Sequence, residues 1–153
     1  MTQVAVRPVQ DADVEVFYEQ QADPVASQMA AFPSRDRAAH FDHWINRVLV
    51  NRDYIRTVIA DGAVAGNIVS WVDPESGHRL FGYWLGRDFW GRGVATEAVR
   101  QYLDEITERP IYADVAVHNI GSQRVLEKNN FVRLSDAPTV ESDGVELLLY
   151  RLD

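Results

Sequence analysis

The stretch RDFWGRGVATEA, from Arg87 to Ala98, places two glycines and two arginines at the start of an amphipathic helix. Apolar residues recur at helical spacing as far as Ile106, and charged residues occupy most of the opposite face. The preceding residues, about 79 to 85, have the pattern of a strand. Gly91 and Gly93 therefore lie in a strand-to-helix turn, where several backbone N–H groups have no partner within the helix.

Such a turn is suited to binding an anion, because the positive end of the helix dipole lies there. Glycine has no Cβ, so a phosphate can approach the amides of residues 91 to 96 closely. Arg87 and Arg92 can add charge-assisted contacts. The same glycines also suit a tight turn with solvated arginines, and the glycine spacing alone leaves both interpretations open.

Two established phosphate-binding motifs fit this turn poorly. A Walker loop requires a lysine followed by Ser or Thr after its second glycine, whereas this chain reads Gly93, Val94, Ala95, Thr96. A dinucleotide fingerprint requires Gly or Ala where Thr96 stands, and it follows a parallel strand. The strands before this turn look antiparallel. Dinucleotide binding is kept as an alternative.

Periodicity and turn residues assign further elements on both sides of the turn. Asp11 and Ser34 are suitable helix caps, Pro24 interrupts the chain between them, and Asp61-Gly62 is a strong hairpin signal. The predicted strands are Val4 to Pro8, Tyr54 to Ala60, Ala63 to Trp71, about 79 to 85, Ile111 to Val117, about 132 to 135 and Val145 to Leu152. The predicted helices run from Asp11 toward Gln21, from Ser34 to about Leu49, from Val94 to Ile106 and from about Ser122 to Asn129.

These elements predict one domain of the α/β (α+β) class over residues 1–153, in the order βααβββαβαββ. The hairpin strands before the glycine turn should pair antiparallel. Weak alternation in Ile111 to Val117 suits a strand that is covered on both faces. A chain of 153 residues with 46% hydrophobic residues can bury a core of ordinary size, so a second domain is not expected.

Charge and composition exclude several classes of function. With 15 basic and 23 acidic residues, the net charge of −8 argues against a general affinity for nucleic acid, which depends on neutralising phosphates. The chain has no cysteine, and its four histidines are too scattered to suggest a metal site. No apolar run approaches the ~20 residues of a membrane span, and no signal-like segment is apparent. We expect a soluble cytoplasmic protein without a membrane partner.

The segment YWLGRDFWGRGVATEAV, Tyr83 to Val99, resembles motif A of the GNAT superfamily of acyl-CoA-dependent N-acyltransferases. Its form is that of the subgroup that includes ribosomal-protein alanine N-acetyltransferases. The segment HNIGSQRVLEKNNF, His118 to Phe131, resembles the second signature of this subgroup, at the expected separation of about 25 residues. The resemblance implies a GNAT fold: a mixed, mostly antiparallel sheet of about seven strands with about four helices and two splayed central strands.

The resemblance also implies acetyl-CoA as co-substrate and places its contacts on this chain. The pyrophosphate would bind the backbone amides of the glycine turn, namely Gly91, Arg92, Gly93, Val94, Ala95 and Thr96. The pantetheine arm would bind the end of the preceding strand at Tyr83, Trp84 and Leu85, and the cofactor would also contact Asn119. Pantetheine amides need backbone partners and a pyrophosphate needs N–H groups, so the chemistry agrees with these assignments.

The chain departs from the family pattern at several positions. Trp90 replaces the usual Gln or Arg, so a side-chain contact is expected to be lost, and Asn130 replaces a glycine but tolerates the same left-handed conformation. Leu126 stands where many members have a tyrosine general acid. Ser122 is the expected substitute, binding the departing thiolate by a hydrogen bond. Because Ser122 opens a predicted helix, capping is an equally suitable role, and both roles remain open.

The implied reaction is direct attack of a neutral amine on the thioester carbonyl. An α-amine with pKa near ~8 needs far less help to lose its proton than an alkylammonium near ~10.4, so a protein or peptide amino terminus is favoured as acceptor over a polyamine. Glu141 corresponds loosely to a base proposed in the subgroup. The Leu85 N–H is a candidate oxyanion donor.

The first two predicted helices flank the acceptor side of this fold. Phe32, Phe41 and Trp44 would either line the acceptor pocket or pack in the core. We expect a monomer or homodimer that uses no metal. A non-catalytic acyl-CoA-binding module would keep the glycine turn and Asn119 without turnover, and it is retained as an alternative function.

Overall fold

The structure is a computed structural model that describes residues 1–134, 139–140 and 144–153. Its elements are β1 (Val4–Pro8), α1 (Asp13–Gln21), α2 (Pro24–Ala30), α3 (Arg37–His43), η1 (Trp44–Val48), η2 (Leu49–Tyr54), β2 (Arg56–Ala60), β3 (Ala63–Val72), β4 (Arg79–Leu85), η3 (Arg87–Phe89), α4 (Val94–Glu105), β5 (Ile111–Ala116), α5 (Ile120–Lys128), β6 (Val132–Arg133), β7 (Thr139–Val140) and β8 (Glu146–Leu152). Here η1 is a π-helix, whereas η2 and η3 are 3₁₀-helices.

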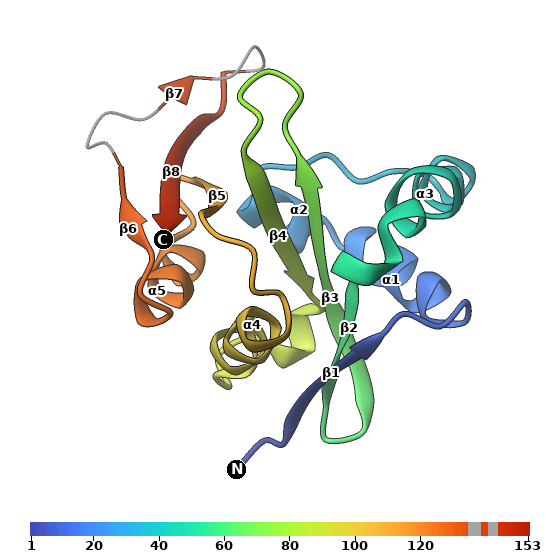
Figure 1. Cartoon of the computed structure of the whole chain (residues 1–153). Helices are drawn as coiled ribbons and strands as arrows, with labels where there is room; N and C mark the ends of the chain where they lie inside the picture. Colours follow the sequence, from blue (N-terminus) through green and yellow to red (C-terminus); the bar gives the residue numbers. More distant parts are fainter. Residues whose placement is uncertain (135–138, 141–143) are drawn as a thin grey trace.

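The described strands form one mixed sheet in the order β1-β2-β3-β4-β5-β8-β6, with β7 paired to β8 (Figure 1). The strands β1 to β4 pair antiparallel, as predicted. Within the described residues, β4 and β5 form the parallel pair, and their register covers only Arg79 with Ile111 and Leu80 with Tyr112. The predicted mixed, mostly antiparallel sheet with two splayed central strands is therefore confirmed.

Apolar residues cover both faces of the sheet. The larger core cluster joins the sheet to α4 and α5, and the α4 stripe of Val94, Ala98, Val99, Tyr102 and Leu103 is buried in it. A smaller cluster packs α1, η1 and η2 on the sheet, with the rings of Phe17 and Trp44 4.8 Å apart. Figure 1 shows α4 and α1 on opposite sides of β1 to β4. Each large apolar side chain buried in this way contributes about 1.5–3 kcal/mol.

The turn between β2 and β3 confirms the hairpin signal, because Asp61 and Gly62 have φ angles of 48° and 82°. Both residues of a type I′ turn need positive φ, which Asp and Gly tolerate. Asn130 after α5 has φ of 71°, as expected for its place at a helix end.

The amino-terminal helices differ most from the prediction. α2 was missed because Pro24 was interpreted as an interruption, whereas it occupies the first turn of α2 behind Asp23, whose side chain accepts the Val25 N–H. Proline is favoured at that position because its missing N–H has no helical partner. α3 is capped by Asp36 rather than Ser34, and it continues into η1 and η2 instead of ending near Leu49 as one α-helix.

α1 is also not capped by Asp11. The N-cap residue is Ala12, with no side-chain cap hydrogen bond. Asp13 is buried instead, and its Oδ2 accepts the Gln10 N–H at 2.9 Å.

Candidate active site

Strands β4 and β5 pair only through the first two residues of each and then diverge. Beyond that point, the Gly86 N–H donates to the Ala65 carbonyl oxygen on β3 at 2.8 Å. Because backbone groups alternate in direction along a strand, the N–H of Leu85 points away from β3 and toward the gap. At the carboxyl end of β4, the Leu85 N–H is therefore not paired with another described strand, whereas the Leu85 carbonyl oxygen accepts a side-chain N–H from Trp90.

The glycine turn exposes a run of N–H groups beside the end of β4. Gly91 and Gly93 both have φ of 73°, a conformation that costs glycine little. A Cβ at either position would meet nothing within 4 Å, so the space in front of the turn is open. Among the described residues, no acceptor contacts the N–H groups of residues 91 to 96. Together with the dipole of α4, these groups fit a bound diphosphate.

A cleft of about 460 Å³ joins the turn to the gap between the strands. Its lining brings together most of the residues predicted to bind the cofactor, namely Tyr83, Trp84, Leu85, Gly91, Gly93, Val94, Ala95, Thr96 and Asn119. The open turn suits a diphosphate, and the Leu85 N–H at the end of β4 suits an amide of a pantetheine arm. The residues present therefore fit acetyl-CoA.

The two arginines of the glycine turn are bound elsewhere. Arg92 pairs with Asp61 at 2.9 Å and lies over the ring of Phe89. Arg87 pairs with Asp23 at 2.9 Å. Neither side chain lines the cleft, so the role predicted for Arg92 depends on its backbone N–H alone.

Two cations that the sequence analysis missed line the cleft from α5. Arg124 and Lys128 are one helical turn apart and exposed, and neither has an ion pair with another described residue. Residues four apart lie on the same helix face, so this spacing on a predicted helix was the available signal. Their position suits contacts to phosphate groups.

A hydrogen bond from the Trp90 side chain connects the glycine turn to the end of β4. The indole Nε1 donates to the carbonyl oxygen of Leu85 at 3.1 Å, and the ring packs against the larger core cluster. The side-chain contact expected to be lost at this position is thus replaced by one within the chain.

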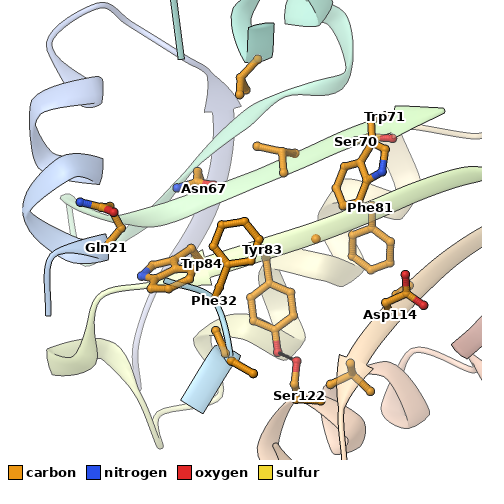
Figure 2. A pocket seen from close by; sticks show the side chains of 18 of the residues that line it. Gln21, Phe32, Asn67, Ser70, Trp71, Phe81, Tyr83, Trp84, Asp114 and Ser122 are labelled. Atoms are coloured by element: carbon orange, nitrogen blue, oxygen red, sulfur yellow. Dashed lines mark hydrogen bonds between the residues drawn. The ribbon is translucent and has the colours of Figure 1, made fainter. Parts of the chain in front are cut away.

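Ser122 contacts Tyr83 and does not cap α5. Asn119 is the N-cap, and its Oδ1 accepts the Ser122 N–H at 3.2 Å. The Ser122 Oγ lies 2.7 Å from the Tyr83 hydroxyl (Figure 2). Burial raises the pKa of Tyr83 to about 12, against the opposing effect of the Ser122 hydrogen bond. The Tyr83 hydroxyl is therefore protonated at neutral pH. One hydrogen bond joins the two hydroxyl groups, and each oxygen keeps its own proton.

A second cavity, of about 750 Å³, adjoins the cleft. Tyr83, Trp84, Asn119 and Ser122 line both spaces. A volume in this range can hold a ligand the size of a short peptide. The two spaces thus meet at the Tyr83–Ser122 pair.

Aromatic side chains form much of the wall of this second cavity, which we call the acceptor cavity. Phe32 and Trp44 line it, whereas Phe41 packs against the smaller core cluster. The buried Asn67 of β3 also lines the cavity, near Trp84 in Figure 2. Of the two roles considered for the three aromatic residues, Phe32 therefore takes the first, Phe41 takes the second, and Trp44 takes both, because it lines the cavity and is also buried in the smaller core cluster.

Asp114 of β5 is an acidic residue of the acceptor cavity that the sequence analysis did not single out. Its side chain is exposed, and Figure 2 shows it on the same side of the cavity as Ser122. The sequence pattern of this strand alternates weakly, so it did not indicate that Asp114 would face a cavity. Glu141, the expected base, lies outside the described residues.

The described part of the chain contains no group of three or more His, Cys, Asp or Glu side chains that could hold a metal ion. His40 is buried, and its Nε2 lies 3.1 Å from the Val14 carbonyl oxygen. Among the described helices, none combines the length and apolar character needed to cross a membrane.

The family can now be stated. A model described as an acetyltransferase (GNAT) domain matches residues 3–132. The chain belongs to the GNAT acetyltransferase family. This GNAT protein is therefore an acetyl-CoA-dependent acyltransferase, which decides against the non-catalytic module and the dinucleotide-binding protein.

Known relatives agree with this assignment. An uncharacterised N-acetyltransferase, p20, of Bacillus licheniformis is 28% identical over 139 residues, which cover 84% of this chain and 78% of that protein. RimL, a ribosomal-protein α-N-acetyltransferase solved with coenzyme A, has a TM-score of 0.78 at 17% identity, over 97% of this chain and 93% of that one.

Two further solved structures have the same fold and other acceptors. The spermidine N-acetyltransferase from Vibrio cholerae, solved with CoA and spermine, has a TM-score of 0.76 at 14% identity, over 98% of this chain and 95% of that one. An aminoglycoside acetyltransferase solved with coenzyme A has a TM-score of 0.75 at 18% identity, over 96% and 94%. At such identities the likeness establishes the fold, and the acceptor must be argued from this chain.

Proposed function

We propose that this GNAT enzyme transfers an acetyl group from acetyl-CoA to the α-amine of a protein or peptide amino terminus, by direct attack of the amine. Residues 1–153 would act as one N-acetyltransferase domain. The observation that carries the proposal is the junction of the cleft and the acceptor cavity at Tyr83 and Ser122. An acyl donor in one space and an amine in the other would meet at these two hydroxyl groups.

When bound, acetyl-CoA supplies the acetyl group as a thioester. The N–H groups of residues 91 to 96 hold its diphosphate, and Arg124 and Lys128 add positive charge beside the cleft. The edge of β4 and the Asn119 side of the cleft hold the amide-bearing arm. These contacts orient the donor and leave its reactive end at the junction.

Two groups at the junction are placed to stabilise developing charge. The N–H of Leu85 points into the gap and can donate to the thioester oxygen. Either hydroxyl of the Tyr83–Ser122 pair can donate, and we assign the donor to Tyr83 because a phenol is a stronger acid than an alcohol. The Ser122 hydroxyl keeps its proton and can then donate a hydrogen bond to the departing sulfur.

The α-amine is favoured as acceptor because it loses its proton near pH ~8, about two units below a lysine side chain. Weak bases or ordered water suffice for such an amine, and Glu141 is the residue we propose for this role. RimL, which shares the fold, is a ribosomal-protein α-N-acetyltransferase. The fold is thus compatible with a protein acceptor, as it is with the polyamine and aminoglycoside acceptors of other neighbours.

Thiol release from acetyl-CoA with paired acceptors tests the proposal. One peptide has a free α-amine and no lysine, and its partner has a blocked α-amine and one lysine. We expect release only with the first peptide, an acetyl group on its amino terminus by mass spectrometry, and kcat/KM rising with pH up to about 8. Release only with the blocked peptide, or only with a polyamine, would refute the assignment of the acceptor.

A further inference from the structure

Basic residues outnumber acidic ones on the described lining of the acceptor cavity, although the whole chain has net charge −8. The basic group consists of Arg35, His40, His43 and Arg47, and Asp114 is the acidic residue among the described lining residues. Burial lowers the pKa of both histidines, so the two arginines carry the positive charge at neutral pH. In a protein with more acidic than basic residues, a cavity lined mainly by basic residues is not expected by chance. The charge of this cavity thus differs from that of the rest of the molecule.

Arg35 is held in place through its backbone. The Gln21 amide of α1 donates to the Arg35 carbonyl oxygen at 2.9 Å and accepts the Arg35 N–H at 2.6 Å. The guanidinium lies over the ring of Phe32 at 5.2 Å from its centroid. No carboxylate among the described residues pairs with it. Arg35 is therefore a half-buried cation, fixed on an aromatic wall and available to an anion.

Arg47 belongs to η1, a π-helical segment of the kind that recurs at functional sites. Its side chain is exposed and has no ion pair with a described residue. Burial lowers the pKa of His43, and the charges of Arg35 and Arg47 lower it further, against Asp42. Both guanidinium groups therefore lie near one imidazole, which is neutral at neutral pH, so Arg35 and Arg47 form a positive cluster around an uncharged His43.

The part of the chain that carries His43 and Arg47 lies across the cavity from the transfer point. In Figure 2 the teal ribbon of residues around 40 to 50 and Ser122 are on opposite sides of the cavity. Asp114 is on the Ser122 side. An acceptor with an ammonium group at one end and an anionic group at the other matches this separation of charge, whereas a polycation would place positive charge against both arginines.

We propose that the acceptor is an acidic amino-terminal peptide, whose α-amine enters at Tyr83 and Ser122 and whose nearby carboxylate side chain is bound by Arg35 and Arg47. This inference rests on the proposed function and narrows it. Aromatic residues between the two ends would pack on the body of the peptide.

Matched peptides test the inference. Three amidated peptides share a free α-amine and differ only in carrying Glu, Gln or Lys at the second and third positions. We expect kcat/KM to fall in the order Glu, Gln, Lys, with the preference for Glu reduced in high salt. Arg35→Gln and Arg47→Gln should each raise KM for the Glu peptide about threefold to fivefold, and together about tenfold. KM for the Gln peptide should change little.

The control variant is Arg52→Gln, which removes an equal charge from η2 outside the cavity and should leave the order and size of the preference unchanged. Arg47→Glu should shift the preference toward the Lys peptide.

Equal kcat/KM for the three peptides, or a preference for Lys in the unaltered enzyme, overturns the inference while leaving N-acetylation intact. Peptide affinity from tryptophan fluorescence in the presence of CoA reads the same preference without turnover. No thiol release with any peptide counts against the proposed function instead.

Discussion

The Tyr83 hydroxyl lies 2.7 Å from the Ser122 Oγ, at the point where the cleft and the acceptor cavity meet. If Ser122 donates to the departing sulfur, Ser122→Ala should lower kcat by about tenfold to a hundredfold, within the range for loss of one such donor. Steady-state kinetics of thiol release measure this. The dissociation constant for CoA should change by less than about twofold.

Tyr83→Phe leaves the Ser122 hydroxyl in place and removes only its partner. A smaller fall in kcat, about threefold to tenfold, is expected, because Ser122 loses its orienting hydrogen bond. The exposed Ser34→Ala serves as control and should match the unaltered enzyme. A Ser122→Ala variant with normal kcat would show that the pair has a structural role only.

Gly91→Ala should weaken CoA binding by about tenfold or more. A methyl group there would stand in the open space before the turn and would also be strained at φ of 73°. The matched control is Gly77→Ala, whose φ is 74° and whose Cβ likewise meets nothing within 4 Å. Both variants should lose about 1–2 kcal/mol of stability. Calorimetric titration should show weaker binding in Gly91→Ala alone, and equal affinities would contradict a diphosphate at the turn.

Arg124→Gln and Lys128→Gln should each weaken CoA binding about threefold to tenfold and reduce its dependence on salt. Both side chains line the cleft, where they can attract the phosphates. Arg100→Gln removes the same charge from α4, where Arg100 pairs with Glu97 and Asp104, and it should not change the affinity. Affinities measured across a salt series distinguish these cases. A shift common to all three variants would indicate only an effect of net charge.

Acid should destabilise the fold through Asp13. Burial acts to raise the pKa of Asp13, but hydrogen bonds from Arg7, the Gln10 N–H and Thr57 hold it below its usual value. A carboxyl with a depressed pKa stabilises the folded state above its unfolded pKa of about 3.9, and this contribution is lost as the pH falls through the folded pKa.

Asp13→Asn should therefore lower the free energy of unfolding at pH 7 by about 3 kcal/mol, because it leaves Arg7 partly buried without its partner. The deficit relative to the unaltered protein should shrink below about pH 4. Asp11→Asn, at an almost fully exposed position, should have no comparable effect. Urea denaturation at pH 7 and below about pH 4 measures these free energies of unfolding. A loss of stability in Asp13→Asn that does not depend on pH would argue against the ion pair.

Local sequence signals predicted the elements that surround the cofactor cleft. The apolar stripe located α4 to within one residue at its end, and Asp61-Gly62 located the hairpin. These elements depend on short-range pattern, which one sequence displays fully. α2 was missed because a proline can either end a helix or begin one, and only the Asp23 cap distinguishes the two cases.

Contacts between distant residues could not be predicted from the pattern. Arg92 looked available to a phosphate, but Asp61, 31 positions away, pairs with it. Ser122 looked like a helix cap until the structure placed Tyr83 against it and Asn119 in the capping position. In each case a local motif offered two roles, and a partner from another element decided between them.

The divergence of β4 from β5 turns main-chain atoms toward the donor that we propose for this gap. Peptide N–H and C=O groups are common to all residues except proline, so most side-chain replacements along this edge preserve the contacts. In the proposed mode of binding, a chain can therefore change most of these side chains and still hold coenzyme A, which agrees with the same fold at 14–18% identity in structures solved with coenzyme A.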